Sequence, residues 1–266
     1  MDALLEATAR VQARHFWFVG FRSFVRPLLD EACGGRSGLR VLDCGCGTGA
    51  NLAMLGTSGV AFGFDQSLRG LSLAREAGHA RIVRATVEAI PFPDATFDVA
   101  ASFDVIYALP EQAEQAALAE MHRVLKPGGA LLINVAGMPI LRGTHSILSK
   151  ELRRYTRGRL RSSVEGAGFD VVRLTYTNAS LFPVMLAVRV AQRLAGLRAK
   201  ENAELGITMP PGPVNAALTG LLKLEARALR RVNMPFGSSV LCLGRKRMEL
   251  SARPRRAGVE PSGRRS

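Results

Sequence analysis

The 266-residue sequence has few cysteines, few aromatic residues and a shortage of acidic residues. The four cysteines are irregularly spaced, so they predict no disulfide framework and fit a reducing compartment. The amino terminus carries acidic residues and no apolar run, which argues against a secretory signal and predicts a cytoplasmic protein. With 47% apolar and 22% charged residues, the chain is still able to bury a substantial core, so the composition argues against intrinsic disorder.

The shortage of acidic residues leaves a net charge of +14, and this charge is concentrated in two blocks. Residues 142–161 hold seven basic residues against one acidic one, and residues 245–266 hold eight against two. Neither block has interleaved aromatic residues that would stack on bases, so nucleic-acid binding is disfavoured. The proline-, glycine- and serine-containing segment 248–266 is predicted to be a disordered basic tail.

From residue 39 onward, short β-rich or apolar runs alternate with helical stretches and Gly/Pro/Asp punctuation, a pattern typical of a doubly wound α/β sheet with helices on both faces. We therefore predict a Rossmann-like α/β fold with a helical amino-terminal cap and a helical insert before the last strand. The predicted strands are Leu39–Asp43, Val60–Phe64, Ala80–Val83, Phe97–Phe103, Ala130–Ala136, Phe169–Tyr176 and Ser238–Arg245. The predicted helices are Glu111–Leu125, the basic stretch Ser149–Ala167, Leu181–Leu194 and Val214–Val232, with L-K-P-G-G (Leu125–Gly129) as a helix stop.

These elements predict five parts of the chain: a cap over 1–36, a core over 37–180, an insert over 181–235, the last strand over 236–247, and the tail. Within the insert, the apolar segment 181–194 is too short to span a bilayer before two arginines interrupt it. Either it packs as a cover over a pocket, or it lies at a membrane surface together with the basic tail. The oligomeric state is left open.

A glycine-rich stretch, V-L-D-C-G-C-G-T-G-A, follows the first predicted strand. Its glycines let the backbone turn sharply and approach a ligand. The letters also fit the dinucleotide fingerprint, but two details disfavour a nicotinamide oxidoreductase: the third glycine falls at G-x-G-x-G spacing, and Asp43 precedes the first glycine by two residues. A carboxylate there repels a pyrophosphate and attracts the cationic amino-acid end of S-adenosylmethionine, which has no phosphate.

These residues resemble the class I S-adenosylmethionine-dependent methyltransferases, whose first motif is V-L-D-x-G-C-G-x-G. Three further motifs follow in order within residues 39–136: G-F-D-Q-S, A-I-P-F-P-D-A-T-F-D-V and L-K-P-G-G. The stretch A-I-P-F-P-D-A-T-F-D-V is similar to a motif of the small-molecule, methyltransferase-11-like members, and L-K-P-G-G is similar to the family's turn before strand five. H-F-W-F near the start, R-R-Y-T and the late helical insert resemble a narrower bacterial group often found beside sugar- and lipid-modifying enzymes.

The resemblance implies S-adenosylmethionine as cofactor, with Asp65 binding the ribose hydroxyls and Thr86 near the adenine amine. The predicted cofactor-binding residues are Asp43, Gly45, Cys46, Gly47, Gly49, Asp65, Gln66, Thr86, Val87, Phe103 and Trp17. At two places the sequence departs from the family: Thr86 replaces an acidic residue, and Tyr107 with Ala108 replaces the Glu-His pair that usually follows strand four. These departures leave the cofactor in place and put the substrate chemistry in doubt.

A methyl acceptor needs a base only if it carries a proton at neutral pH. His145 follows strand five at the ligand-binding edge of the sheet, and an imidazole suits such a role, so His145 is the leading candidate base. Tyr107 and Tyr155 are further hydrogen-bonding candidates and complete the predicted catalytic set. His15, Arg153 and Arg154 are predicted substrate contacts, because guanidinium groups match an anionic acceptor; a solvated basic helix face is the alternative.

We therefore predict an enzyme that transfers a methyl group from S-adenosylmethionine to a small-molecule acceptor, anionic or linked to a lipid or sugar, with O-methylation ahead of C- or N-methylation. The alternative is a non-catalytic cofactor-binding protein or a membrane-surface interaction protein. No metal is predicted, because Cys44 and Cys46 lack the second pair of ligands that a zinc site needs.

Overall fold

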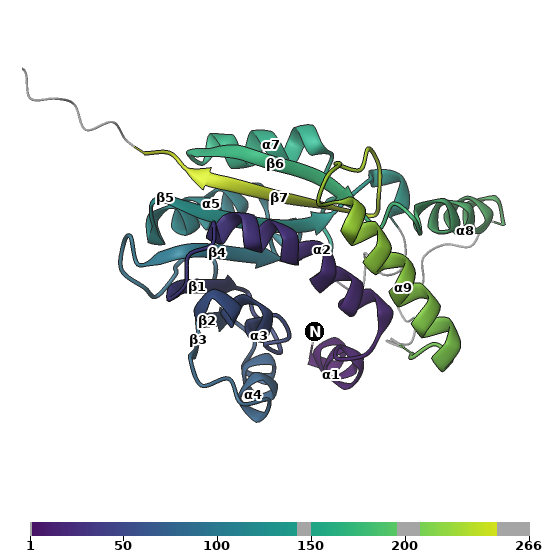
Figure 1. Ribbon diagram of the computed structural model, residues 1–266, viewed down its shortest axis with the longest axis horizontal. Coiled ribbons are helices and arrows are strands. Elements are labelled where there is room, and N and C mark those ends of the chain that lie inside the picture. Colours follow the sequence, from purple (N-terminus) through teal and green to yellow (C-terminus); the bar gives the residue numbers. More distant parts are fainter. Residues whose placement is uncertain (1, 143–149, 196–207, 249–266) are drawn as a thin grey trace, which may run out of the picture.

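The computed structural model describes residues 2–142, 150–195 and 208–248, which fold around a seven-stranded sheet (Figure 1). The strand order is β3-β2-β1-β4-β5-β7-β6. The predicted seven-stranded Rossmann-like fold is thereby confirmed. The strands are β1 (Leu39–Cys44), β2 (Gly59–Asp65), β3 (Ile82–Arg84), β4 (Phe97–Phe103), β5 (Leu125–Ala136), β6 (Phe169–Thr177) and β7 (Ser239–Lys246).

Strand β7 runs antiparallel to both of its neighbours, whereas the pairings among β1 to β5 are parallel. The alternation of strands and helices did not predict this reversal. Its cause is the connection between the last two strands: Thr177 ends β6 directly opposite Ser239, which begins β7. The chain thus leaves and re-enters the sheet at one edge, so the insert between them is positioned over the carboxyl ends of the parallel strands, where open α/β sheets bind ligands.

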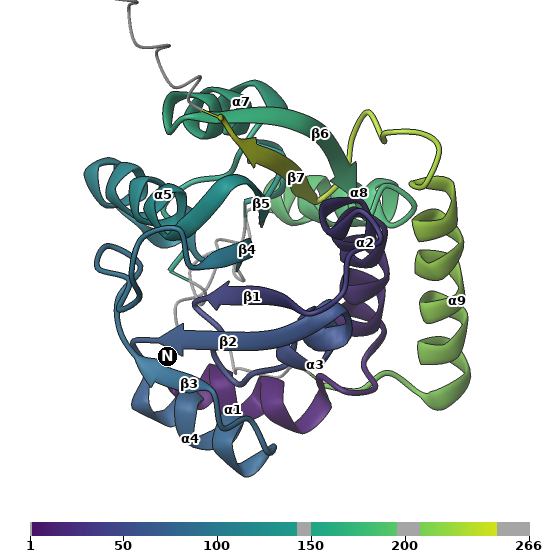
Figure 2. The same cartoon turned by 60° about the vertical axis from the view of Figure 1, so that its left-hand side comes forward.

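One face of the sheet is covered by α2 (Phe16–Cys33) and α9 (Gly212–Ala228), which lie side by side in both views (Figures 1 and 2). Their buried side chains pack on alternate residues of the central strands, as in Val41, Val99 and Leu132. Gly20 permits the close approach of the two helices, since a Cβ there would lie 2.4 Å from Leu222 Cδ1. The predicted cap and insert therefore each contribute a helix to the main core.

The opposite face is covered by α5 (Glu111–Val124) and α7 (Arg157–Gly166), packed on the intervening residues of the same strands. A smaller cluster joins α3 (Leu52–Leu55) and α4 (Leu68–Glu76) at the β2–β3 side. Because each strand alternates its side chains between the two faces, the central strands are buried on both sides, as their apolar sequences predict.

Helix α5 ends at Val124, so the predicted helix stop at residues 125–129 is confirmed. Two other predicted boundaries are wrong. Strand β5 begins at Leu125 instead of Ala130: Leu125 pairs with Phe97, and the register shifts before the regular pairing resumes. The predicted helix 149–167 is limited to α7, because Thr156 caps its amino end by accepting a hydrogen bond from Arg159 N at 3.2 Å. The residues before Thr156 instead cross the edge of the sheet, where Tyr155 forms an isolated bridge with Gly137.

Two helices lie outside these layers. Helix α1 (Asp2–Val11) packs near α4, and α8 (Phe182–Leu194) extends beyond the carboxyl edge of the sheet (Figure 1). Helix α8 has no buried residue. The segment before α8 is held by Glu225 of α9, which accepts hydrogen bonds from Ala179 N and Ser180 N, each at 2.9 Å. Among the described residues, no helix is both long and apolar enough to cross a membrane.

Candidate functional site

The glycine loop follows β1 and has a backbone that only glycine adopts without strain. Gly45, Gly47 and Gly49 have φ of 85°, 51° and 76°. The loop is fixed to β2 because Gly45 N and Cys46 N both donate to Phe64 O at 2.9 Å. A Cβ on Gly45 would lie 2.5 Å from Val105 Cγ2. The loop therefore presents backbone rather than side chains at the carboxyl edge of the sheet.

Asp65, at the end of β2, braces this loop through one carboxylate oxygen, which accepts from Gly47 N at 2.8 Å. Its other oxygen accepts from Ser67 N, also at 2.8 Å, at the beginning of α4. Each oxygen retains a second lone pair, so the carboxylate is still able to accept hydroxyl donors. The neighbouring Gln66 is exposed, and Ala85 N donates to Asp65 O at 3.1 Å, which brings the segment after β3 beside the same strand end.

Asp43 lies beneath the loop and is 1% exposed. Its Oδ2 has no hydrogen-bond partner among the described residues. Burial, followed by the negative charge of Asp65, raises the pKa of the Asp43 carboxyl to about 7. A buried carboxyl group with an unpartnered oxygen favours a ligand that brings positive charge or a donor to this place.

Helix α1 covers the glycine loop. Leu5 Cδ2 would lie 3.6 Å from a Cβ placed on Gly47, and Thr48 Oγ1 donates to Gln12 Oε1 at 2.6 Å. An ion pair between Arg69 and Glu6, 2.8 Å, ties α1 to α4. The loop is thus enclosed between the sheet edge and the amino-terminal helix.

A cavity of about 480 Å³ adjoins the loop on the β4–β5 side. Its apolar wall is formed mainly by aromatic residues of α2: Phe16, Trp17, Phe18 and Phe21. The cavity and the loop share two segments. Asp104 lines the cavity while Val105 contacts the loop, and Leu4 and Thr8 of α1 line the cavity while Leu5 faces the loop. A ligand in the cavity therefore lies next to one in the glycine loop.

The opposite wall of the cavity is polar. Asp104 and Asn134 come from the ends of β4 and β5, and Glu151 and Arg154 from the segment before α7. Arg154 forms an ion pair with Glu151 at 2.9 Å and donates to Gly137 O at 2.8 Å. Burial lowers the pKa of Arg154, and the negative charge of Glu151 partly offsets this lowering. One wall is therefore suited to an apolar group and the other to a hydrogen-bonding one.

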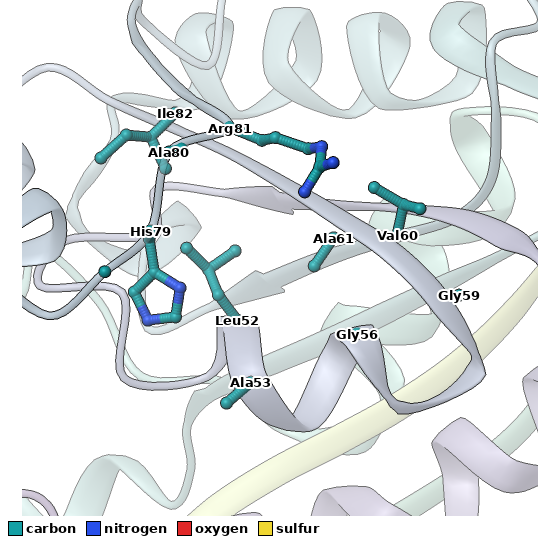
Figure 3. A pocket seen from close by; sticks show the side chains of 11 residues that line it. Leu52, Ala53, Gly56, Gly59, Val60, Ala61, His79, Ala80, Arg81 and Ile82 are labelled. Atoms are coloured by element: carbon teal, nitrogen blue, oxygen red, sulfur yellow. The ribbon is translucent and has the colours of Figure 1, made fainter.

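Figure 3 shows a second hollow, about 320 Å³, between α3, the beginning of β2 and residues 78–82. Its lining is mostly glycine and aliphatic side chains, with His79 and Arg81. The His79 ring supports the glycine loop, since its Cδ2 would lie 2.6 Å from a Cβ on Gly49. No carboxylate lines this hollow, so it offers no acid–base pair.

Comparisons with known proteins agree with this geometry. Residues 42–133 match the methyltransferase domain family. The chain is 30% identical over 186 residues to the ubiquinone/menaquinone biosynthesis C-methyltransferase UbiE of Shewanella pealeana, covering 56% of this chain and 72% of that protein. The chain belongs to the class I S-adenosylmethionine-dependent methyltransferases. It spans about half the length of three other curated relatives that it matches (45%, 52% and 52%).

Solved methyltransferase structures share the fold. A methyltransferase from Thermotoga maritima has a TM-score of 0.57 at 20% identity, covering 93% of this chain and all of that one. A phosphoethanolamine N-methyltransferase from Haemonchus contortus, solved with S-adenosyl-L-methionine, has a TM-score of 0.52 at 19% identity, covering 83% of this chain and 51% of that one. At these identities the likeness shows the fold alone.

S-adenosylmethionine is the cofactor of this methyltransferase family, and the residues present fit it. The unpartnered Asp43 oxygen matches its cationic portion, Gly47 leaves room because a Cβ there would meet only Leu5 at 3.6 Å, and Asp65 retains acceptor capacity for the ribose. Thr86 is exposed beside the end of β3 and Val87 is buried. Their contact with the adenine stays a prediction.

Two other predicted cofactor contacts, Trp17 and Phe103, lie outside the glycine loop. Trp17 lines the cavity rather than the glycine loop, and Phe103 is buried against Phe21, with ring centroids 5.2 Å apart. Burial raises the pKa of the Cys46 thiol, as expected for a small packing residue that stays protonated. In the described part of the chain, no three His, Cys, Asp or Glu side chains gather as metal ligands.

The predicted catalytic and substrate residues divide into two sets. The cavity lining includes Tyr107, His15 and Arg154. Tyr155 is fully buried in the core and Arg153 pairs with Glu114, so the structure brings neither to the cavity. His145 lies outside the described residues, as does the tail beyond Met248.

Two of these placements change the expected role. His15 caps α2: its Nδ1 accepts from Trp17 N at 3.2 Å, a backbone hydrogen bond joins it to Thr208, and burial lowers its pKa. Both arginines already have carboxylate partners, so neither offers a free guanidinium to an anionic acceptor.

The sequence interpretation missed Asp104 and Asn134. The available signal was their position directly after, or within, the ends of two neighbouring predicted strands, since such ends meet at the ligand-binding edge.

Proposed function

We propose that this methyltransferase transfers the methyl group of S-adenosylmethionine to a small amphipathic acceptor bound in the cavity beside the glycine loop. The observation that carries the proposal is the shared lining of loop and cavity by residues 104–105 and by α1. The cofactor supplies an activated methyl group. The protein's own part is to align the acceptor with it and to exclude water, which α1 and the aromatic wall support.

The two walls of the cavity narrow the acceptor class. An apolar portion fits against the aromatic residues of α2, and a hydrogen-bond donor fits against Asp104 and Asn134. A hydroxyl group has this character, so we favour O-methylation over C- or N-methylation. The relatives named above are a C-methyltransferase and an N-methyltransferase, and neither sets the atom methylated in this chain.

The proposal is tested by incubating the protein with S-adenosylmethionine labelled in its methyl group and three probes of matched chain length: 4-octylphenol, octylamine and an octyl 1,3-diketone. We expect label transfer to the phenol at the highest rate. Stoichiometric cofactor binding without transfer to any probe would instead support the alternative of a non-catalytic cofactor-binding protein.

A second proposal concerns the membrane surface. Exposed apolar side chains lie on α8, among them Val184 (65% exposed) and Val188 (48%), which are one turn apart on the same face, and Leu194 (84%) near its end. The chain's charge of +14 favours anionic lipids over neutral ones. We propose that α8 contacts the inner face of the membrane and so gives a lipid-linked acceptor access to the cavity, which Met185 and Arg189 of the same helix line.

Co-sedimentation with phosphatidylcholine vesicles containing one-fifth phosphatidylglycerol tests this contact. Wild type should pellet, and the double variant Val184→Asp/Val188→Asp should stay in the supernatant. Equal pelleting of the two forms would remove α8 from the membrane contact.

A further inference from the structure

Asp104 has a backbone conformation that residues other than glycine rarely adopt. It follows β4 with φ of 60°, in the left-handed region that costs L-residues roughly 1–2 kcal/mol. Two hydrogen bonds hold it there: Asp104 N donates to Asn134 O, and Asn134 Nδ2 donates to Asp104 Oδ1, each at 2.9 Å. Strain of this kind concentrates at functional sites, where the surrounding structure maintains it.

The carboxylate held in this way faces the cavity. Asp104 is exposed, and the cavity lining includes it. The hydrogen bond from Asn134 is received by Oδ1, which leaves Oδ2 open to a ligand. Asn134 is 2% exposed, and its own Oδ1 has no hydrogen-bond partner within the described residues. A carboxylate oxygen and an orphaned amide oxygen at one end of an apolar cavity together suit a ligand that donates hydrogen bonds.

The other ionisable groups around the cavity are already engaged. Glu151 pairs with Arg154, and His15 accepts from Trp17 N and has a further backbone hydrogen bond to Thr208. The remaining groups that face this space are Tyr107 and Arg189, and Arg189 donates to Gln192 Oε1 at 2.8 Å. Within the described lining, Asp104 is therefore the carboxylate with no cationic partner in direct contact.

The surroundings adjust the affinity of this carboxyl for a proton. Its depth in the protein raises the pKa to about 7, the negative charge of Glu151 adds to the rise, and Asn134 and Arg154 oppose it. The side chain is open to water while the cavity is empty, so the full effect of burial applies once an apolar acceptor displaces that water. A base that titrates near neutral pH is well matched to proton transfer.

We infer that Asp104 is the general base of the methyl transfer proposed above, and that Asn134 is its positioning residue. In the step, the acceptor's X–H bond gives its proton to an Asp104 oxygen. The electron pair of X forms the new bond to the methyl carbon, and the pair of the broken carbon–sulfur bond stays on sulfur. The products are the methylated acceptor, S-adenosylhomocysteine and a neutral Asp104, which returns its proton to solvent. The inference rests on the proposed function.

Asp104→Asn tests this role with little structural change, because asparagine tolerates the left-handed conformation and its side-chain oxygen is able to accept from Asn134. With 4-octylphenol as probe, we expect kcat to fall by about 10²- to 10⁴-fold. Two binding measurements should change less than threefold: calorimetric titration of S-adenosylhomocysteine, and quenching by the probe of Trp17, the sole tryptophan. Asp170→Asn, a far-surface carboxylate 67% exposed, is the matched control and should behave as wild type.

The pH profile separates catalysis from structure. For wild type, kcat, which reports the enzyme with its acceptor bound, should rise as pH rises through about 7, and Asp104→Asn should lose this rise. A variant rate within threefold of wild type with the same profile would overturn the inference and leave the proposed function standing.

If wild type methylates no probe, the proposed function fails, and carbon-13 NMR of the carboxyl groups in the complex with both S-adenosylhomocysteine and 4-octylphenol still decides on Asp104. The inference expects a resonance, absent from Asp104→Asn, that titrates near 7. A resonance that titrates below 5 would overturn it.

Discussion

The glycine-loop half and the cavity half of the site are built in different ways. The loop half consists of backbone from one continuous stretch, braced by Asp65 and lying above Asp43. The cavity half consists of side chains from segments far apart in the sequence, including α1, α2, α8 and the ends of β4 and β5. A site made of backbone depends on the absence of side chains, whereas a site made of side chains depends on helix packing far from the chemistry. The following variants test that difference.

The largest effect should come from Gly45→Ala. Alanine at this position would be strained by the left-handed backbone, and its Cβ would lie 2.5 Å from Val105 Cγ2. The two effects together raise the free energy of the native loop conformation by about 3 kcal/mol. Calorimetry should show S-adenosylhomocysteine affinity reduced by about 100-fold. The matched control is Gly35→Ala, which has similar φ (74°) but no neighbour within 4 Å, and it should leave the affinity unchanged. Equal losses in both variants would mean that general destabilisation, not the loop, is being measured.

Asp43→Asn should remove the loss of stability that the Asp43 carboxyl causes as pH rises. The folded pKa of about 7 lies above the unfolded value of ~3.9, so folding favours the protonated form and stability is lost as pH rises between these values. Without ligand, the variant should match wild type at pH 4 and exceed it by up to roughly 4 kcal/mol at pH 8. Thermal unfolding across this range measures the difference. Its S-adenosylmethionine affinity should fall, and parallel pH profiles for the two proteins would contradict the account.

Gly20→Ala should disturb the cavity half and spare the loop half. The added methyl group forces α9 away from α2, at a cost of about 1–3 kcal/mol. Because α2 carries the aromatic wall, quenching of Trp17 by 4-octylphenol should require higher probe concentrations while S-adenosylhomocysteine affinity stays within threefold. In α9, Gly220 has no neighbour within 4 Å, so Gly220→Ala should instead stabilise the protein by up to about 1 kcal/mol. Similar stability changes in the two variants would contradict this packing.

The smallest effect should separate two adjacent arginines. Arg154→Gln removes a cavity residue and leaves Glu151 unpaired, so KM for 4-octylphenol should rise about five- to tenfold. Arg153→Gln acts outside the cavity and should leave KM unchanged, although it lowers stability by freeing buried Glu114. Equal KM values in both variants would place Arg154 outside the acceptor's reach.

The loop half could be predicted from the sequence because its information is local. The sequence shows the closely spaced glycines, which adopt positive φ, together with an aspartate before them and a second aspartate twenty residues after the first glycine. The alternation of apolar runs with helical stretches, separated by Gly, Pro and Asp, predicted the sheet and its helices. The cavity half was not predictable in this way. Whether Tyr155 or Tyr107 faces the ligand, and which arginine is buried beside it, depends on how residues 150–156 cross the sheet edge, and no local pattern encodes that path. The positions of Asp104 and Asn134 at two neighbouring strand ends were visible in the sequence, but the hydrogen bonds that join them across the sheet were not.

We propose that the glycine loop binds S-adenosylmethionine through Asp43 and Asp65. The most direct measurement is calorimetric titration of the full chain with S-adenosylmethionine, S-adenosylhomocysteine and NAD. The account predicts one-to-one binding of the first two, no binding of NAD, and weaker binding of S-adenosylmethionine to Asp65→Asn. Binding of NAD, or no binding of S-adenosylmethionine and S-adenosylhomocysteine, would contradict it.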